Sequence, residues 1–518
     1  MSCHLLNLHA ELQFLIFEQL QKCENPGKPD VQKNVKPRHR VQFHGEAMFE
    51  RDLRNLSLTC GFYYESLIPY TFKNLVLQNS ETSASSILRC TANTSRGYIR
   101  FTKELCFTDT RAMALAMEDD HPGDSSSDED RKDDISMPEL CQLPTSAVEI
   151  LSNLSRFPNL ERLLIHWRFP DSYWYIEQYA IEGDTEDGNG VVEREEQIPW
   201  RALMRDVYNA VSKNVVDINI ASPSPGSSLS SPPQVPTLKS LEITNIPMNP
   251  VSTYFSPTFH NFLSSLRSFK LNLMTCDDIG NYGINTCFQY QMFAHKLDEY
   301  FFNHLSSATS LHISAWGAPL GSPDSGPAYS PLSLPQARGL PVLKRLVLEY
   351  CFITDPTLIG FLVAHARSLE RVKFVKCFSD TDGNTWCKLF EALARARPER
   401  LVEFCVEPAK VKFKEPSWRI NEENEREAAR CQALLDGDGD EREGEWAVGE
   451  GGGVAGRRGR RAFRYGYIDD KYGFVSQVPE NNREMFLRGE DQRAYDALME
   501  IVERNKRRLM GVESGIFV

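Results

Sequence analysis

The sequence lacks the features that mark a membrane protein or a disulfide-stabilised secreted protein. No run of eighteen or more apolar residues occurs in its 518 residues, so we expect no segment that spans a bilayer. Its 13 cysteines are scattered and include no Cys-x-x-Cys pair, which argues against a disulfide framework or a zinc knuckle. We therefore predict reduced thiols, a cytoplasmic or nuclear location, and no membrane partner.

A surplus of basic residues is also lacking, because the formal net charge is −13. The acidic excess is confined to two segments. Residues 118–134 hold nine acids and two bases, and residues 182–196 hold seven acids and one base. These segments account for the whole imbalance, so the rest of the chain is about neutral. We expect the acidity to lie in loops and do not expect the chain to bind nucleic acid.

Motifs of catalysis and cofactor binding are absent as well. The glycine-rich stretch GEGGGVAGRRGRR has no Gly-Lys-Ser/Thr, so it is not a phosphate-binding loop. Neither Gly-x-Ser-x-Gly nor His-Glu-x-x-His occurs. We therefore predict that the chain is not an enzyme and that it holds no catalytic residue, metal or cofactor.

What the sequence does contain is a recurring apolar pattern. An apolar residue is followed by another three positions later and by a third two positions after that, as in the leucine-rich-repeat template L-x-x-L-x-L-x-x-C-x-L. The last two residues alternate along a short strand, so both face one side of a sheet. The clearest copy has Leu343, Leu346, Leu348 and Cys351, and the next copy, 26 positions on, has Leu369, Val372, Phe374 and Cys377.

Weaker copies of the pattern occur along most of the chain, at uneven intervals. Each predicts a short buried strand, and helices over 356–367 and 383–397 are expected to cover the sheet. Such units stack because none can bury its apolar side alone. A generic α/β protein with several buried strands is the alternative. Two copies at the start of the series have Leu75 and Leu77, then Leu105 and Phe107, as their second and third apolar positions. The other weaker copies begin at Leu160, Val215, Leu238, Leu266, Ala308 and Leu401.

Segments poor in large apolar residues interrupt this pattern. They cannot bury enough surface to offset the entropy of ordering, so we predict loops or disordered insertions there. Beyond residue 410, a helix over 490–509 is expected to cap the end of the repeat-like domain. The predicted insertions are 117–136, 182–197, 221–236, 318–336 and 435–461.

The N-terminal residues 8–20, LHAELQFLIFEQL, form an amphipathic helical pattern with apolar residues at spacing four. A second apolar segment, RDLRNLSLTC, begins at residue 51, after a polar stretch at 21–47. Together these segments resemble the two halves of a fungal-type F-box. The match departs from the motif at His9, where the F-box usually has proline, and in the length of the 21–47 insertion.

The resemblance implies a role for this module. F-box proteins bind a Skp-type adaptor with the F-box and present a substrate, held by the C-terminal domain, to a cullin–RING (SCF-type) ubiquitin ligase. The resemblance thus implies a Skp-type adaptor, a cullin scaffold and an unknown protein substrate as partners. The residues implied in adaptor binding are Leu8, Leu12, Ile16, Leu53 and Leu56.

The predicted organisation is therefore of the α/β class, in three parts. Residues 1–70 form a helical F-box-like module, 71–410 an irregular leucine-rich-repeat solenoid, and 411–518 a C-terminal region. The predicted function is that of a substrate-recognition adaptor of an SCF-type ligase. The alternative is a non-catalytic repeat scaffold with a degenerate F-box and no ligase role.

Overall fold

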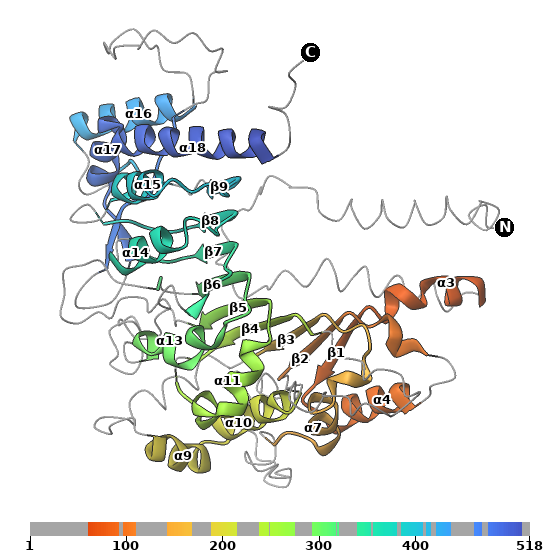
Figure 1. Ribbon diagram of the computed structural model, residues 1–518. Helices are drawn as coiled ribbons and strands as arrows, with labels where there is room; N and C mark the ends of the chain where they lie inside the picture. Colours follow the sequence, from red (N-terminus) through yellow and green to blue (C-terminus); the bar gives the residue numbers. More distant parts are fainter. Residues whose placement is uncertain are drawn as a thin grey trace, which may run out of the picture.

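A nine-stranded, entirely parallel sheet organises the chain in its computed structural model (Figure 1). The strand order across the sheet follows the order along the chain, from β1 to β9. The α/β class predicted from the sequence is confirmed. The residues described by the structure are 61–92, 97–109, 142–167, 188–214, 238–247, 249–274, 293–316, 319–320, 339–353, 356–380, 385–407, 411–415, 421–436, 460–468 and 475–509.

Each strand is short and begins one residue before the second apolar position of a pattern copy. The structure has strands at nine of the ten copies found in the sequence. The strands are β1 (Asn74–Gln78), β2 (Glu104–Thr108), β3 (Arg162–His166), β4 (Ser240–Ile246), β5 (Ser268–Met274), β6 (Ser310–Trp316), β7 (Arg345–Glu349), β8 (Arg371–Val375) and β9 (Glu403–Val406).

The register of the sheet aligns the apolar positions of successive strands into two rows. Leu346 of β7 pairs with Val372 of β8, and Leu348 pairs with Phe374. Because side chains alternate along a strand, both rows face one side of the sheet. All eight residues of the two clearest pattern copies are buried there, including Cys351 and Cys377.

The same backbone contact joins every strand to the next. The carbonyl of the residue just before a strand accepts two hydrogen bonds, one from the N–H of the residue just before the next strand and one from the N–H that follows it. For β7 and β8, Glu370 N and Arg371 N both donate to Lys344 O, at 2.8 and 3.0 Å. The contact is repeated at all eight joints of the sheet, at the carbonyls of Lys73, Lys103, Glu161, Lys239, Arg267, Thr309, Lys344 and Glu370.

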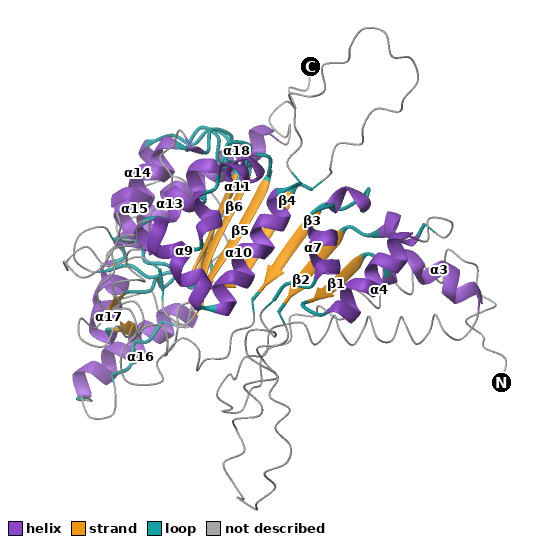
Figure 2. Cartoon of the chain, turned by 90° about the horizontal axis from the view of Figure 1, so that it is seen from below, coloured by secondary structure: helices purple, strands orange, loops and turns teal. Residues whose placement is uncertain are grey.

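Helices form a second layer over the apolar side of the sheet (Figure 2). Among the described helices, none combines the length and the apolar character needed to cross a bilayer. The layer comprises α4 (Glu81–Ala92), α7 (Thr145–Leu151), α10 (Pro199–Ser212), α11 (Pro257–Ser264), α13 (Leu297–Tyr300), α14 (Pro356–Ala364) and α15 (Trp386–Arg395), with 3-10 turns at η2 (Tyr98–Phe101), η3 (Leu154–Arg156), η4 (Ser252–Phe255) and η6 (Phe302–His304). Within this layer α4 contacts α7, α7 contacts α10 and α10 contacts α11, and α14 contacts α15.

The C-terminal helices pack at the end of the sheet beyond β9 (Figure 1). Helix α18 contacts both α15 and β9. Beside it, the buried Arg483 donates to Phe413 O at 2.7 Å and pairs with Glu415 at 3.2 Å. The helices there are α16 (Glu422–Asp436), α17 (Pro479–Arg488) and α18 (Glu490–Leu509), whereas the hairpin of β10 (Gly466–Ile468) and β11 (Val475–Gln477) joins the segment after β8, where Tyr465 bridges to Ser379.

The structure corrects parts of three predicted insertions. The second half of 182–197 is helix α9 (Gly188–Gln197), in which Val191 and Glu195 are buried. Glu195 accepts hydrogen bonds from Ser252 N and Oγ, at 2.5 and 2.7 Å. At the start of 318–336, Leu320 is buried and bridges to Cys351. The first two residues of 435–461 belong to α16, and its last two are described but belong to no helix or strand. Tertiary burial thus overrides local composition at these places.

The pattern copy beginning at Val215 is a further exception. Its residues lie outside the described ranges, and β3 pairs directly with β4, so no strand stands between them. The helices predicted over 356–367, 383–397 and 490–509 correspond to α14, α15 and α18. The segments 117–136 and 221–236 lie outside the described residues, as does the F-box-like module up to Cys60; of that module the structure describes α3 (Gly61–Thr71).

Candidate interaction face of the sheet

The side of the sheet opposite the helices carries the side chains that are available to a partner. We call this side the open face; its middle row consists of one residue from each strand, aligned by the register. Every member of the row is exposed or half-buried, whereas its neighbours in sequence belong to the core or pack against it. The row is Val76, Cys106, Leu164, Glu242, Lys270, His312, Val347, Lys373 and Cys405.

The chemistry of the open face changes along the sheet. Over β1 to β3 the middle row is apolar, and Val76 is 51% exposed. From β4 onward it includes the charged residues Glu242, Lys270 and Lys373. Lys270 pairs with Glu242 of the neighbouring strand at 2.7 Å. A partner that crosses the whole face would therefore meet an apolar surface first and a charged one afterwards.

Glu349 of β7 is the centre of a charged group on this face. It lies 3.7 Å from His312 Nε2 of β6 and 3.9 Å from Lys376 Nζ, the residue after β8. The His312 contact, with a further contribution from Lys376, holds the pKa of Glu349 below its usual range despite partial burial. This carboxylate therefore stays charged at neutral pH.

Polar side chains connect the carboxyl ends of the central strands. His166 Nδ1 and Thr244 Oγ1 are 2.5 Å apart, and Asn272 Nδ2 donates to Ser314 Oγ at 2.8 Å. Asn245 adopts the left-handed conformation, with φ of 56°, and its N–H donates to Asn272 Oδ1. These bonds fix the side chains at this end of the face, which makes the surface preorganised for binding.

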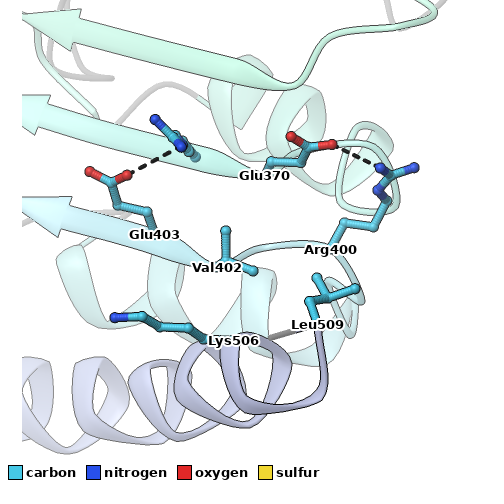
Figure 3. A pocket seen from close by; sticks show the side chains of 7 residues that line it. Glu370, Arg400, Val402, Glu403, Lys506 and Leu509 are labelled. Atoms are coloured by element: carbon cyan, nitrogen blue, oxygen red, sulfur yellow. Dashed lines mark hydrogen bonds and ion pairs between the residues drawn. The ribbon is translucent and has the colours of Figure 1, made fainter. Parts of the chain in front are cut away.

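A hollow of about 480 Å³ lies where the open face meets the end of α18 (Figure 3). Figure 3 shows Val402 between two ion pairs on one side and Lys506 and Leu509 on the other. Leu509 is 58% exposed and contributes apolar surface to the hollow. The residues that line the hollow are Glu370, Arg371, Arg400, Val402, Glu403, Lys506 and Leu509.

Two ion pairs involve four of the five charged residues that line the hollow, and Lys506 is the fifth. Arg371 Nε lies 3.4 Å from Glu403, and Arg400 Nη2 lies 2.8 Å from Glu370. Glu370 also forms an ion pair with Lys344, which lies outside the lining, with Lys344 Nζ 3.2 Å from the carboxylate. No acidic side chain within the described part of the chain pairs with Lys506. The lining therefore has an excess of one positive charge.

The thiols of the sheet are poorly suited to nucleophilic chemistry. Contact with Cys377, together with burial, raises the pKa of Cys351, and burial raises that of the half-buried Cys405. A raised pKa keeps a thiol protonated and unreactive. Across the described ranges, no group of three or more His, Cys, Asp or Glu side chains is placed to hold a metal ion.

The residues singled out in the sequence do not form this face. The eight pattern residues lie in the core, on the opposite side of the sheet. The five residues implied in adaptor binding all precede residue 61 and lie outside the described residues. The repeat pattern identifies the residues that face the core. The residues between them in each strand, such as Lys270 and His312, must then face the other side, and the open face could have been predicted in this way.

Comparison with models of known protein families finds no match for this chain, and comparison with curated proteins finds none either.

Proposed function

We propose that the chain is a non-catalytic, substrate-recognition subunit of an SCF-type cullin–RING ubiquitin ligase. In this proposal the F-box-like module binds a Skp-type adaptor through Leu8, Leu12, Ile16, Leu53 and Leu56. The open face binds a protein substrate. The chain makes no covalent bond itself and acts by raising the effective concentration of the substrate near the ubiquitin-loaded enzyme.

The observation that carries the proposal is the repeated joint between neighbouring strands. The same pair of backbone hydrogen bonds recurs at all eight joints, although the intervals between strands differ widely in length. A repeated contact of this kind supports an irregular leucine-rich-repeat solenoid, in which each unit contacts mainly its neighbours. Such arrays tolerate insertions within single units as loops.

The size of the open face favours a macromolecular partner over a small molecule. With strands about 4.8 Å apart, nine strands span roughly 40 Å. Small ligands, by contrast, bind in concave, mostly apolar pockets. Ion pairs such as Lys270–Glu242 offer hydrogen-bonding groups at the surface, and polar groups of this kind confer specificity in protein recognition.

A calorimetric titration of a purified Skp-type adaptor into the full chain tests the proposal. We expect sub-micromolar binding, weakened at least about tenfold by Leu12→Ala together with Ile16→Ala, because both remove apolar contact area. The matched control is Val342→Ala with Val363→Ala, two exposed valines of the sheet domain, which should leave the affinity unchanged.

The non-catalytic scaffold is the second candidate, favoured by His9 and by the insertion at 21–47. Absence of adaptor binding by a folded full chain would reject the ligase role and leave the scaffold. If the adaptor binds, recovery of the cullin with the chain and adaptor in a pull-down would reject the scaffold. The double alanine variant is the negative control in this pull-down.

A further inference from the structure

We propose that the hollow at the end of the sheet binds an acidic segment of a partner protein that carries a large apolar side chain among its acidic residues. The acidic residues would contact Arg371 and Lys506 of the lining and Arg345 just outside it, in register beside Arg371. The apolar side chain would pack on Val402 and Leu509. This inference rests on the proposed role of the open face in partner binding and names the class of segment bound at one end of it.

The first observation is a like-charge contact between neighbouring strands. Arg345 of β7 lies in register beside Arg371 of β8, and both are exposed on the open face. Like charges placed opposite each other in a sheet are destabilising. Glu403 of β9, in register on the other side, neutralises Arg371 at 3.4 Å. No described acidic residue pairs with Arg345, so an anion from a partner would relieve the repulsion.

The second observation is the position of Lys506. Its backbone lies on α18, far along the chain from the strands, yet its side chain lines the same hollow (Figure 3). It has no ion pair with a described residue, and it stands across the hollow from the Arg371–Glu403 pair. Part of its charge offsets the helix dipole at the C-terminal end of α18. The hollow nevertheless presents an uncompensated cation to solvent.

The third observation is apolar surface in the midst of these charges. Leu509 is 58% exposed and lies beside the half-buried Val402. A volume of about 480 Å³ accommodates side chains of an incoming segment. Basic groups around an exposed aliphatic surface complement acidic groups around an aliphatic side chain. The hollow therefore fits a partner segment of that composition.

Fluorescence anisotropy with the full chain tests the inference. The probe is a short fluorescein-labelled peptide with glutamates on both sides of one central leucine. We expect it to bind at about 50 mM salt and to bind more weakly at about 300 mM, because salt screens exposed charges. A second peptide, with glycine in place of the leucine, should bind more weakly if Val402 and Leu509 take part.

Variants separate the hollow from general charge. Arg345→Glu with Lys506→Glu should weaken binding of the leucine peptide at least about tenfold. Arg267→Glu is the matched control, since Arg267 is an exposed arginine at the same edge of the sheet near β5, and it should change the affinity less than about twofold. The neutral pair Arg345→Gln with Lys506→Gln repeats the test without new repulsion, and thermal melting checks that each variant is folded.

Several results would overturn the inference. These are no binding at low salt, equal binding by the double variants, equal loss in Arg267→Glu, or equal binding of the glycine peptide. Tighter binding of a single-stranded oligonucleotide, lost in the same double variants, would assign the hollow to a nucleic acid instead. No adaptor enters the titration, so a failure here leaves the adaptor-binding test unaffected.

Discussion

Asp491 shows how one buried carboxyl group connects two helices. It lies in the first turn of α18, is 4% exposed, and accepts hydrogen bonds from Tyr465 Oη at 2.6 Å and from Cys387 N at 2.9 Å. Cys387 belongs to the first turn of α15, whose N–H groups need acceptors. Burial raises the pKa of Asp491 from 3.8 to about 6, although both hydrogen bonds oppose the shift.

This raised pKa predicts a pH-dependent stability. The protonated carboxyl favours the folded state, so its contribution is complete below pH 3.8 and is lost as the pH rises through about 6. Relative to Asp491→Asn, the wild-type free energy of unfolding should fall over this range by at most about 3 kcal/mol. The amide can keep both contacts, because Tyr465 can also accept a hydrogen bond.

Urea denaturation between about pH 4 and pH 7 measures this difference. Asp496→Asn, which changes an exposed aspartate of the same helix, is the matched control. A difference between wild type and Asp491→Asn that stays constant with pH would show that Asp491 does not titrate in this window.

Among the elements, α18 is attached to the last unit of the sheet partly through the side-chain amide of Asn505, beside Arg508, which donates to Glu399 O. Asn505 is buried and donates from Nδ2 to Pro398 O at 2.5 Å and to Leu401 O at 3.1 Å. Both carbonyls belong to the connection between α15 and β9. The amide of Asn505 supplies each of them with a hydrogen-bond donor. The apolar contacts of the buried Leu498 and Val502 complete the packing.

We expect Asn505→Ala to lower the free energy of unfolding by about 2 kcal/mol, because two buried carbonyls lose their donor. Asn505→Asp should cost more, since it places a carboxylate against both oxygens. Arg504→Ala, at an exposed neighbouring position, should stay within about 0.5 kcal/mol of wild type. Denaturation measures these values, and faster hydrogen exchange in β9 upon Asn505→Ala would locate the effect. Unchanged exchange would contradict the attachment.

The strands could be predicted from the sequence, and some helices could not, for a physical reason. In β7, Leu346 and Leu348 must both face the core, so the strand pattern is present in the sequence itself. In α9, the acid-rich composition indicated a loop. The helix is stabilised instead by tertiary contacts, as Glu195 accepts from Ser252 of η4, far along the chain. No local pattern encodes such a contact.

At the scale of the whole molecule, the candidate site was the least predictable part. The hollow combines Arg371, Val402 and Lys506, which come from three elements. Their side chains are partly or largely exposed, so no burial pattern constrains them. The left-handed conformation of Asn245, whose N–H donates to Asn272, is likewise not encoded locally. Asparagine adopts φ above zero more readily than most residues, but the sequence does not show which asparagine does so.

The sheet should also tolerate removal of residues 221–236. The residues flanking the undescribed stretch are both bonded to the segment 154–161, because Asn214 Oδ1 accepts from Leu154 N and Lys239 N donates to Glu161 O. The linker left between Asn214 and Leu238 can extend to roughly 25 Å. A shorter loop costs slightly less entropy to close, so we expect the free energy of unfolding to change by less than about 1 kcal/mol. A larger loss in thermal or urea denaturation would show that the segment contributes to the core.

The order of the strands has a consequence for how the chain can fold while it is being synthesised. Each strand from β2 to β9 adds to the edge left by the strand before it, and none is inserted between two earlier strands. During synthesis, every unit that leaves the ribosome therefore meets a surface that is already available, and no finished contact has to open to admit it. Helix α18 is the last described element to emerge, and it covers the final unit.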